Sequence, residues 1–317
     1  MTRARRDTIL VAAVLLGLAA VLAHAHAVRV DLPNEARKVA RHEATLRNEE
    51  RDPYQYKLFT ITWAVESVHR ATGAPVFTLY LWNGFLATFA LLVAHFAWLS
   101  RLYGRRAALL GTGLLAALAH GLFLGYHHHP YDLWGVAGWC LLLRAMAGGA
   151  SIGRLCGTAF VVGLVWEKQA LAAPVHGLLA LRRGEPFPRS ALRAGALLAC
   201  AIASPVAIRL GLGTDREPVD VTPLSAQEWG KVLAHQAPFV LPFLAILVLA
   251  WPRVPPLVRA LWLTVPGLFV AYLASRYLVD ELRSFWAFVP VFTATACAWA
   301  RDLEDAPSGP LAPEAAA

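Results

Sequence analysis

The sequence has few charged residues for its length. Asp, Glu, Lys and Arg make up 16% of the 317 residues, whereas 57% are hydrophobic. In soluble domains about a quarter of the residues are charged. The mean hydropathy of this sequence is +0.50. Because a soluble fold could not bury this much apolar surface, the composition excludes an ordinary soluble domain and predicts an integral membrane protein.

Cysteine is scarce as well. The four cysteines all fall inside apolar runs, without the spacing of a disulfide framework or a zinc site: Cys140, Cys156, Cys200 and Cys297. We expect them to behave as small buried hydrophobic side chains. The sequence also has no Walker lysine motif, no Rossmann glycine pattern and no nucleophile elbow.

The net charge of +8 comes from cations at the ends of apolar runs rather than in one patch. This distribution predicts contact with membrane lipids that carry negative charge, and no nucleic-acid partner. Arginine outnumbers lysine and alanine is abundant, which indicates a GC-rich bacterial genome. We therefore predict a multi-pass protein of the bacterial inner membrane.

The apolar runs predict an all-α polytopic fold with about ten transmembrane helices. The first run, Thr8 to Val28, is long enough to cross a bilayer, although a signal peptide is the alternative. The other spans are expected at 75–100, 107–125, 132–149, 155–167, 169–181, 191–211, 237–251, 259–275 and 285–300. The fourth and fifth of these are short, and one helix broken at Glu167-Lys168 is the alternative. Residues 1–301 would form one transmembrane domain, followed by a disordered cytoplasmic tail at 302–317.

The placement of arginine predicts the orientation. With ten spans, both termini lie on one side, and most arginines in short segments fall on that side: Arg3, Arg5, Arg6, Arg101, Arg105, Arg106, Arg144, Arg154, Arg182, Arg183, Arg189, Arg193, Arg253, Arg259 and Arg301. By the positive-inside rule, the two termini are expected in the cytoplasm.

The long polar loop at 29–73 is then the first outer loop. Pro33 suits the first turn of a helix, with Asp31 or Asn34 available as the N-cap. The apolar stripe in the second half of the loop, Leu58, Ile61, Val65 and Val68, has helical spacing. We expect short interfacial helices here, and read the spacing of Gly149, Gly153 and Gly157 as close helix packing elsewhere in the chain.

Four clusters of polar residues are expected on the outer side of the membrane, and each can be interpreted as functional or as structural. Asp31, at the exit of the first span, is a candidate general base or cation ligand, whereas Glu43, Glu49 and Glu50 are better read as a solvated helix face. Three consecutive histidines do not converge on one ion, so no metal ligand set is assigned, but His128 and Asp132 lie one turn apart. The alternative there is a polar surface turn.

The other two clusters are also ambiguous. Glu167 and Lys168 form either a self-satisfied pair or a carboxylate facing a cavity at a helix break. Near the last span, an arginine held by a carboxylate would offer the planar donor fork that suits phosphate, and an interfacial ion-pair network is the alternative. That cluster contains Arg276, Tyr277, Asp280, Glu281 and Arg283.

A first span followed by a long acidic outer loop resembles the GT-C superfamily of integral membrane glycosyltransferases. Asp52-Pro53-Tyr54-Gln55-Tyr56-Lys57-Leu58 is similar to a tyrosine-rich YxYR-like stretch in bacterial members, with Lys57 in place of arginine. Glu167-Lys168-Gln169 loosely resembles an Arg-Glu-Thr-like element, and Glu281-Leu282-Arg283 before Pro290 matches a Glu-x-Arg element. The likeness covers roughly 1–300, without the outer C-terminal domain of larger members.

The resemblance implies inverting transfer of a sugar from a polyprenyl-phosphate-linked donor to an acceptor hydroxyl. It implies Asp31 as the base, with Asp52 as second choice, and Arg276, Arg283 or Lys168 on the phosphate. The remaining substrate-binding candidates are Tyr54, Tyr56, Lys57, His128, Asp132, Glu167, Tyr277 and Glu281. A divalent cation is one option for a cofactor, and the acceptor stays open.

Two other classes remain. A transporter of a small anionic solute would also gather ionisable groups between helices, but it usually shows internal repeats, and none is evident. A non-catalytic membrane scaffold would need none of the outer clusters, so neutralising them would change little beyond stability.

Overall fold

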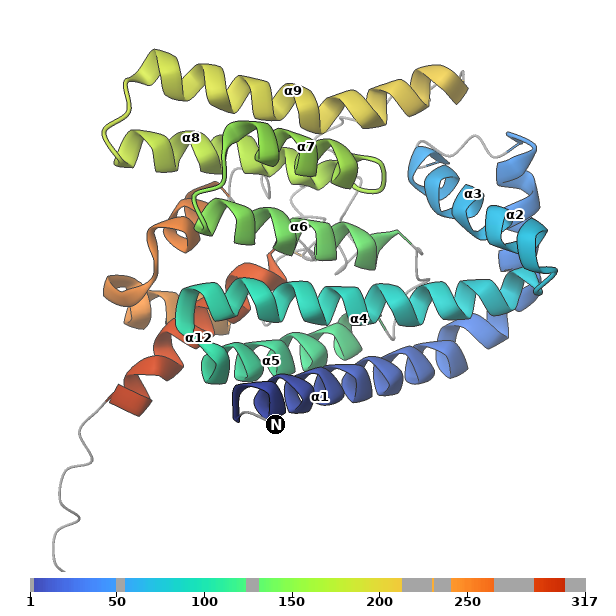
Figure 1. The fold of residues 1–317 in the computed structure, drawn as a ribbon, viewed down its shortest axis with the longest axis horizontal. Coiled ribbons are helices and arrows are strands. Elements are labelled where there is room, and N and C mark those ends of the chain that lie inside the picture. Colours follow the sequence, from blue (N-terminus) through green and yellow to red (C-terminus); the bar gives the residue numbers. More distant parts are fainter. Residues whose placement is uncertain are drawn as a thin grey trace, which may run out of the picture.

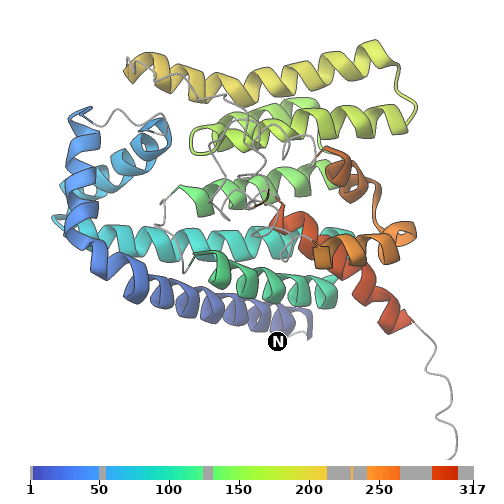
Figure 2. The same ribbon diagram turned by 180° about the vertical axis from the view of Figure 1, so that it is seen from behind.

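A computed structural model describes residues 3–49, 55–123, 131–212, 230, 241–264 and 288–305. Within these ranges the chain is almost entirely helical and contains no strand, which confirms the all-α prediction. Most of the helices lie side by side in a bundle (Figure 1), and the view from behind shows the same arrangement (Figure 2). The helices are α1 (Arg3–His26), α2 (Glu35–Leu46), α3 (Gln55–Thr72), α4 (Val76–Tyr103), α5 (Arg105–Phe123), α6 (Asp132–Ala147), α7 (Ile152–Gly163), α8 (Ala172–Arg182), α9 (Phe187–Leu212), residues 241–250 and 256–264, and α12 (Val289–Asp305), with shorter turns between them.

Three helical stretches are long and apolar enough to cross a membrane: Arg5–Leu46, Val76–Tyr103 and Phe187–Leu212. Shorter apolar helices accompany them at Ile152–Gly163, Leu241–Arg253 and Val289–Ala300. Large apolar side chains on α1 and α9 are exposed, including Leu10, Val14, Leu192 and Leu210. Since exposed apolar surface of this extent is rare in water, these faces fit a lipid environment. The count of ten spans stays a prediction.

Helical backbone continues past Val28, where the first span was predicted to end. A π-helical turn, η1 (Ala27–Asp31), and a 3₁₀ turn, η2 (Leu32–Asn34), join α1 to α2. Irregular turns and a proline interrupt the regular helical hydrogen bonding and produce bends, and Pro33 lies in the second of these turns. The chain turns here, so that α2 leaves α1 at a steep angle (Figure 1).

The region of the two short predicted spans is a helical hairpin. Between α7 and α8 lies a 3₁₀ turn, η3 (Glu167–Leu171), so this region has two separate helices, as in the main reading, and not one helix broken at Glu167-Lys168. The turn before η3 fits closely against α6, because a Cβ atom at Gly135 would overlap the Trp166 side chain. The packing reading of Gly149, Gly153 and Gly157 is wrong, since in the described structure a Cβ atom on any of them would meet nothing within 4 Å.

Buried polar contacts join helices inside the bundle. His95 on α4 contacts the hydroxyls of Thr112 on α5 (3.1 Å) and Thr293 on α12 (2.7 Å). Trp262 donates a hydrogen bond to Thr295 at 2.8 Å. Polar groups that are satisfied in this way fix the relative register of neighbouring helices at little cost in free energy.

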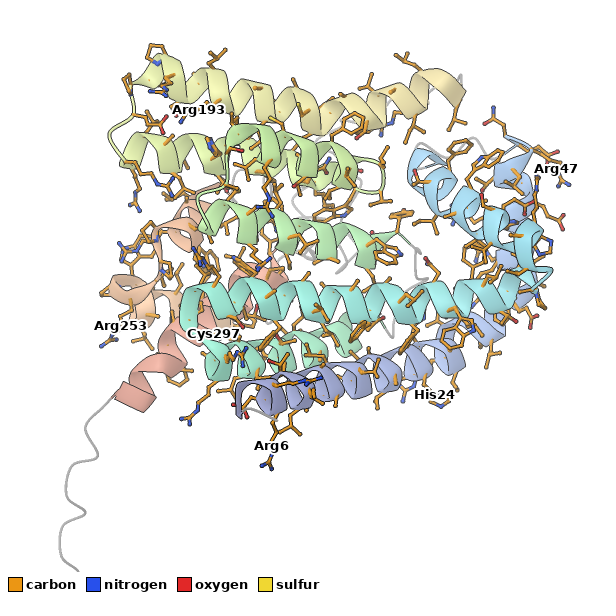
Figure 3. All side chains as sticks on the ribbon, viewed as in Figure 1. Arg6, His24, Arg47, Arg193, Arg253 and Cys297 are labelled. Carbon is orange, nitrogen blue, oxygen red and sulfur yellow. The ribbon has the colours of Figure 1, made fainter. Side chains whose placement is uncertain are left out.

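Helices α4 to α9 run alternately in opposite directions, and this gives the bundle two distinct ends (Figure 1). One end carries α2, α3 and the turn at η3, and we call it the α2–α3 end. The other we call the arginine end, after its cations at successive helix termini: Arg101, Arg105, Arg106, Arg144, Arg154, Arg182, Arg183, Arg189 and Arg193. Arg193 and Arg253 lie toward this end, while His24 and Arg47 lie toward the other (Figure 3).

Helix α12 continues to Asp305, past residue 302, where the tail is predicted to start. Two of the four cysteines, Cys140 and Cys297, are buried as predicted, and Cys156 and Cys200 are half-buried.

Candidate functional site

Helices α2 and α3 are the predicted interfacial helices, and they are attached to the bundle at several points. Thr60 on α3 donates a hydrogen bond to the carbonyl oxygen of Leu164, at 2.8 Å, in the turn after α7. Asn48, just after α2, donates to the carbonyl oxygen of Leu212 at the end of α9 (3.0 Å). The pair therefore lies across one end of the bundle rather than apart from it.

Asp31 is the last residue of η1 and is buried, with 7% of its side chain exposed. One carboxylate oxygen accepts from the ammonium group of Lys38 on α2. The other lies 3.1 Å from Nδ1 of His26, at the end of α1. Neither Asp31 nor Asn34 makes the expected side-chain cap, because Asp31 is used in these ion pairs and Asn34 Nδ2 donates to the carbonyl oxygen of Val30 at 2.7 Å.

A second buried network joins α2, α3 and α4. His42 on α2 is 2% exposed, and its Nε2 lies 3.1 Å from a carboxylate oxygen of Glu66 on α3. Its Nδ1 lies 3.0 Å from the hydroxyl of Tyr80 on α4, which also contacts the Thr62 hydroxyl at 3.2 Å. Arg70 donates from Nε to the second oxygen of Glu66 at 2.6 Å.

These contacts set the charge of Glu66. Its pKa lies below its ordinary value of 4.5, first because Arg70 donates a hydrogen bond to the carboxylate and second because His42 contacts it. Burial opposes the shift but is outweighed. Glu66 is therefore an anion at neutral pH, and its contact with His42 holds α2 and α3 together.

A small apolar cluster underlies this network. Ile61 and Val65 on α3 are buried against Tyr131, which precedes α6, and Tyr80 and Val165 pack around them. The stripe of Leu58, Ile61, Val65 and Val68 that predicted a helix lies on α3, where Ile61 and Val65 are buried and Val68 is 46% exposed. Ile61 and Val65 supply hydrophobic contacts that fix the position of the polar network.

Three further predicted site residues lie at the same end. Asp132 is in the first turn of α6, where the helix dipole favours a carboxylate. Glu167 and Lys168 begin η3, and the Lys168 ammonium lies 5.8 Å from the centre of the Trp166 ring. The topology therefore gathers Asp31, Asp132, Glu167 and Lys168 at one end of the bundle.

The remaining predicted site residues lie either at the start of α3 or outside the described residues. Tyr56 and Lys57 lie in the first turn of α3. The others fall outside the described residues: Asp52, Tyr54, His128, Arg276, Tyr277, Glu281 and Arg283. Among the side chains that the structure places, no group of three or more His, Cys, Asp or Glu could hold a metal ion.

Sequence reasoning missed the partners of the two buried carboxylates. His42 is separated from Glu66 by 24 residues and from Tyr80 by 38, so no local pattern joins them. The one local signal was the i,i+4 spacing of Glu66 and Arg70. By contrast, Glu43 and Arg47 lie four residues apart on α2 and pair at 3.7 Å, but both side chains are more than half exposed, and such pairs contribute little.

No protein-family model, curated protein or solved structure matches this chain. Its function is therefore inferred from its own residues and their geometry.

Proposed function

We propose that this chain is an integral membrane glycosyltransferase. It moves a sugar from a polyprenyl-phosphate-linked donor to an acceptor hydroxyl at the α2–α3 end, with inversion at the anomeric carbon. The proposal rests on the GT-C-like order of a first span, a polar segment with two short helices, and a second span, together with one feature of the site.

That feature is Asp31. It is a buried carboxylate at the exit of the first span, and Lys38 and His26 each hold one of its oxygens. An oriented carboxylate at the membrane surface is the group that a lipid-linked donor and a polar acceptor would both reach.

In the proposed reaction, Asp31 accepts the proton of the acceptor hydroxyl as that oxygen attacks the anomeric carbon. The bond between the anomeric carbon and the phosphate oxygen breaks, and the lipid phosphate leaves with the bonding electron pair. The proton stays on Asp31 until solvent removes it. General base catalysis of this kind contributes about 10²–10⁴-fold to a rate.

The phosphate that leaves carries negative charge, which a cation must stabilise. Lys168, on η3 at the same end, is the described candidate, and Arg276 and Arg283 are the predicted ones. Lys38 differs from these because it already contacts Asp31, and we assign it to holding the base in position.

The network of His42, Glu66 and Tyr80 has a positioning role in this proposal. It fixes α2 against α3 and α4, and α2 carries Lys38. A change in this network is expected to disturb Asp31 through Lys38, without removing a reacting group.

Transfer of radiolabelled sugar tests the proposal, with purified protein in lipid vesicles and a panel of polyprenyl-phosphate sugars. We expect Asp31→Asn to lower the transfer rate by about 10²-fold or more. Glu43→Gln, which removes an exposed carboxylate from α2, should transfer at the wild-type rate. Asp52→Asn is included because that residue is the second candidate for the base.

Wild-type rates in Asp31→Asn and Asp52→Asn together would remove the base assignment. An absence of transfer from every donor, with folded protein, would contradict the enzyme and favour the transporter or scaffold.

A further inference from the structure

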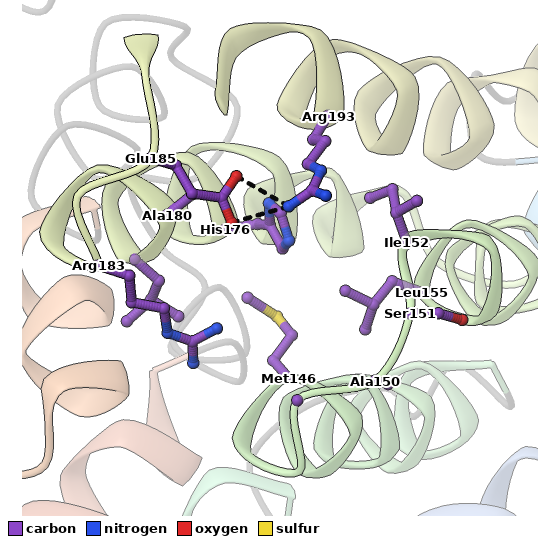
Figure 4. A pocket seen from close by; sticks show the side chains of 12 residues that line it. Met146, Ala150, Ser151, Ile152, Leu155, His176, Ala180, Arg183, Glu185 and Arg193 are labelled. Atoms are coloured by element: carbon purple, nitrogen blue, oxygen red, sulfur yellow. Dashed lines mark hydrogen bonds and ion pairs between the residues drawn. The ribbon is translucent and has the colours of Figure 1, made fainter. Parts of the chain in front are cut away.

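The arginine end contains a cavity of about 350 Å³ that the proposed reaction does not use. It lies among the end of α6, the start of α7, α8 and the first turns of α9. Its polar lining consists of Ser151, His176, Arg183, Glu185 and Arg193, and its apolar lining includes Met146 and Leu155. Figure 4 shows Arg183 on one side of this space, facing the Glu185–Arg193 pair and His176.

The charged groups around the cavity are not equivalent. Arg193 donates from Nη1 to both carboxylate oxygens of Glu185, each at 2.8 Å, so these two charges offset one another. The guanidinium of Arg183 makes no ion pair or hydrogen bond with any residue that the structure describes. Arg183 therefore gives the cavity an excess positive charge.

His176 adds a second polar atom, Nδ1, that lacks a partner among the described residues. This atom is buried. A buried polar atom in this state costs free energy unless a ligand or water satisfies it. The first turn of α7, capped by Ser151, also opens on the cavity, and the dipole of that helix favours an anion.

A second cavity of about 450 Å³ adjoins the first, and Met146, Leu179 and Arg183 line both. The rest of its lining is apolar apart from Arg182: Leu102, Ala147, Pro255, Pro256 and Leu257. Arg183 thus lies where the two cavities meet. The first is lined by His176, Ser151 and the Glu185–Arg193 pair as well as apolar side chains, and the second mainly by apolar side chains. This arrangement matches a molecule with an anionic head and a hydrocarbon chain.

We propose that these two cavities bind one anionic phospholipid, with its phosphate beside Arg183 and His176 and an acyl chain in the apolar cavity. Basic pockets between membrane helices on the cytoplasmic side commonly bind lipid head groups, and the arginine end has the cations expected for that side. Arginine suits phosphate because its planar guanidinium can donate two parallel hydrogen bonds. The site is separate from Asp31 and does not depend on the proposed sugar transfer.

A soluble phosphate would share the polar half of the site but would leave the apolar cavity empty. Binding of dioctanoyl phosphatidylglycerol, dioctanoyl phosphatidylcholine and inorganic phosphate to the full chain in detergent distinguishes the two sources. We expect phosphatidylglycerol to bind at least about tenfold more tightly than either of the others. Inorganic phosphate has no acyl chain for the second cavity, and phosphatidylcholine carries no net negative charge. Equal binding of inorganic phosphate and phosphatidylglycerol would overturn the lipid assignment.

Two variants localise the binding. Arg183→Gln should weaken phosphatidylglycerol binding by about tenfold or more, since it removes the charge shared by both cavities. Arg189→Gln is the matched control, because it removes an exposed arginine at the same end that lines neither cavity. Equal weakening by both variants would indicate general surface charge and contradict the site.

A third variant tests the apolar half without changing charge. Leu179→Phe narrows both cavities, and we expect it to weaken phosphatidylglycerol binding as well. Unchanged binding in Leu179→Phe would contradict an acyl chain in this position.

Discussion

The two ends of the bundle differ in how far their charged side chains are buried and paired. At the α2–α3 end, Glu66 and His42 are 10% and 2% exposed and contact each other directly. At the arginine end, the Glu185–Arg193 pair is 25% and 31% exposed, and Arg183 faces a cavity. Buried pairs at the first end fix the geometry of three helices, whereas cations at the second remain available to solvent, lipid or ligand.

The difference follows from the cost of burial. A buried ion is stable only if hydrogen-bond partners replace its water, so Asp31 and Glu66 each have a histidine and a cation as partners. Exposed arginines need no such partner, and their role in orientation depends on number and side rather than on contacts. Substitutions should therefore affect stability more at the α2–α3 end.

The largest difference in stability is expected between two glycines, one at each end. Gly135→Ala would overlap Trp166 and should lower the free energy of unfolding by up to about 3 kcal/mol. Gly153→Ala near the start of α7 would meet nothing within 4 Å and should be neutral or stabilising by less than about 1 kcal/mol. Thermal unfolding in detergent measures both, and equal effects would contradict the close approach of α6 to the turn at Trp166.

A smaller difference is expected between the ion pairs. His42→Phe removes a contact of both Glu66 and Tyr80 and should cost about 1–3 kcal/mol, because buried polar groups lose a partner. Arg193→Gln breaks a partly exposed pair and should cost less than about 1 kcal/mol. The same unfolding assay compares them, and a greater loss in Arg193→Gln would reverse the comparison.

Acid should weaken the α2–α3 end selectively. The pKa of Glu66 is lowered by Arg70 and His42, so its contribution to stability is complete above its ordinary value of 4.5 and is lost as pH falls through the lower folded value. The difference in Tm between wild type and Glu66→Gln should thus be constant from pH 5 upward and shrink below about pH 4.5. A Tm difference between wild type and Glu66→Gln that grows as the pH falls would contradict this expectation.

The smallest effect is expected at an exposed pair on α2. Glu43→Gln breaks the contact with Arg47, in which both side chains are more than half exposed, and should change stability by less than about 0.5 kcal/mol. A larger loss would mean that the outer face of α2 is also part of the packed structure.

Local patterns in the sequence predicted much of this arrangement. Helical spacing predicted α3, apolar length predicted α4 and α9, and two short apolar runs around Glu167 predicted the hairpin of α7 and α8. Helical backbone continues past Val28 through η1 and η2, because a change in residue polarity does not by itself end a helix.

Contacts between distant segments could not be predicted in this way. Nothing local joins His42 to Glu66 and Tyr80, or Arg183 to the cavity beside His176. The spacing of Gly153 and Gly157 suggested close packing, but small residues permit a helix to approach only where another helix faces them. Close approaches occur instead at other glycines, among them Gly135 and Gly138, which face Trp166 and Val162.

We propose that the two ends face opposite sides of a membrane, with Asp31 outside and the arginines inside. Single cysteines at exposed positions, Glu49→Cys at the α2–α3 end and Arg189→Cys at the arginine end, test it with a membrane-impermeant maleimide on intact bacterial cells expressing the protein. Wild type, with its native cysteines, gives the background. We expect Glu49→Cys to be labelled in intact cells and Arg189→Cys only after permeabilisation. Labelling of both from the same side, or of Arg189→Cys alone in intact cells, would contradict the account.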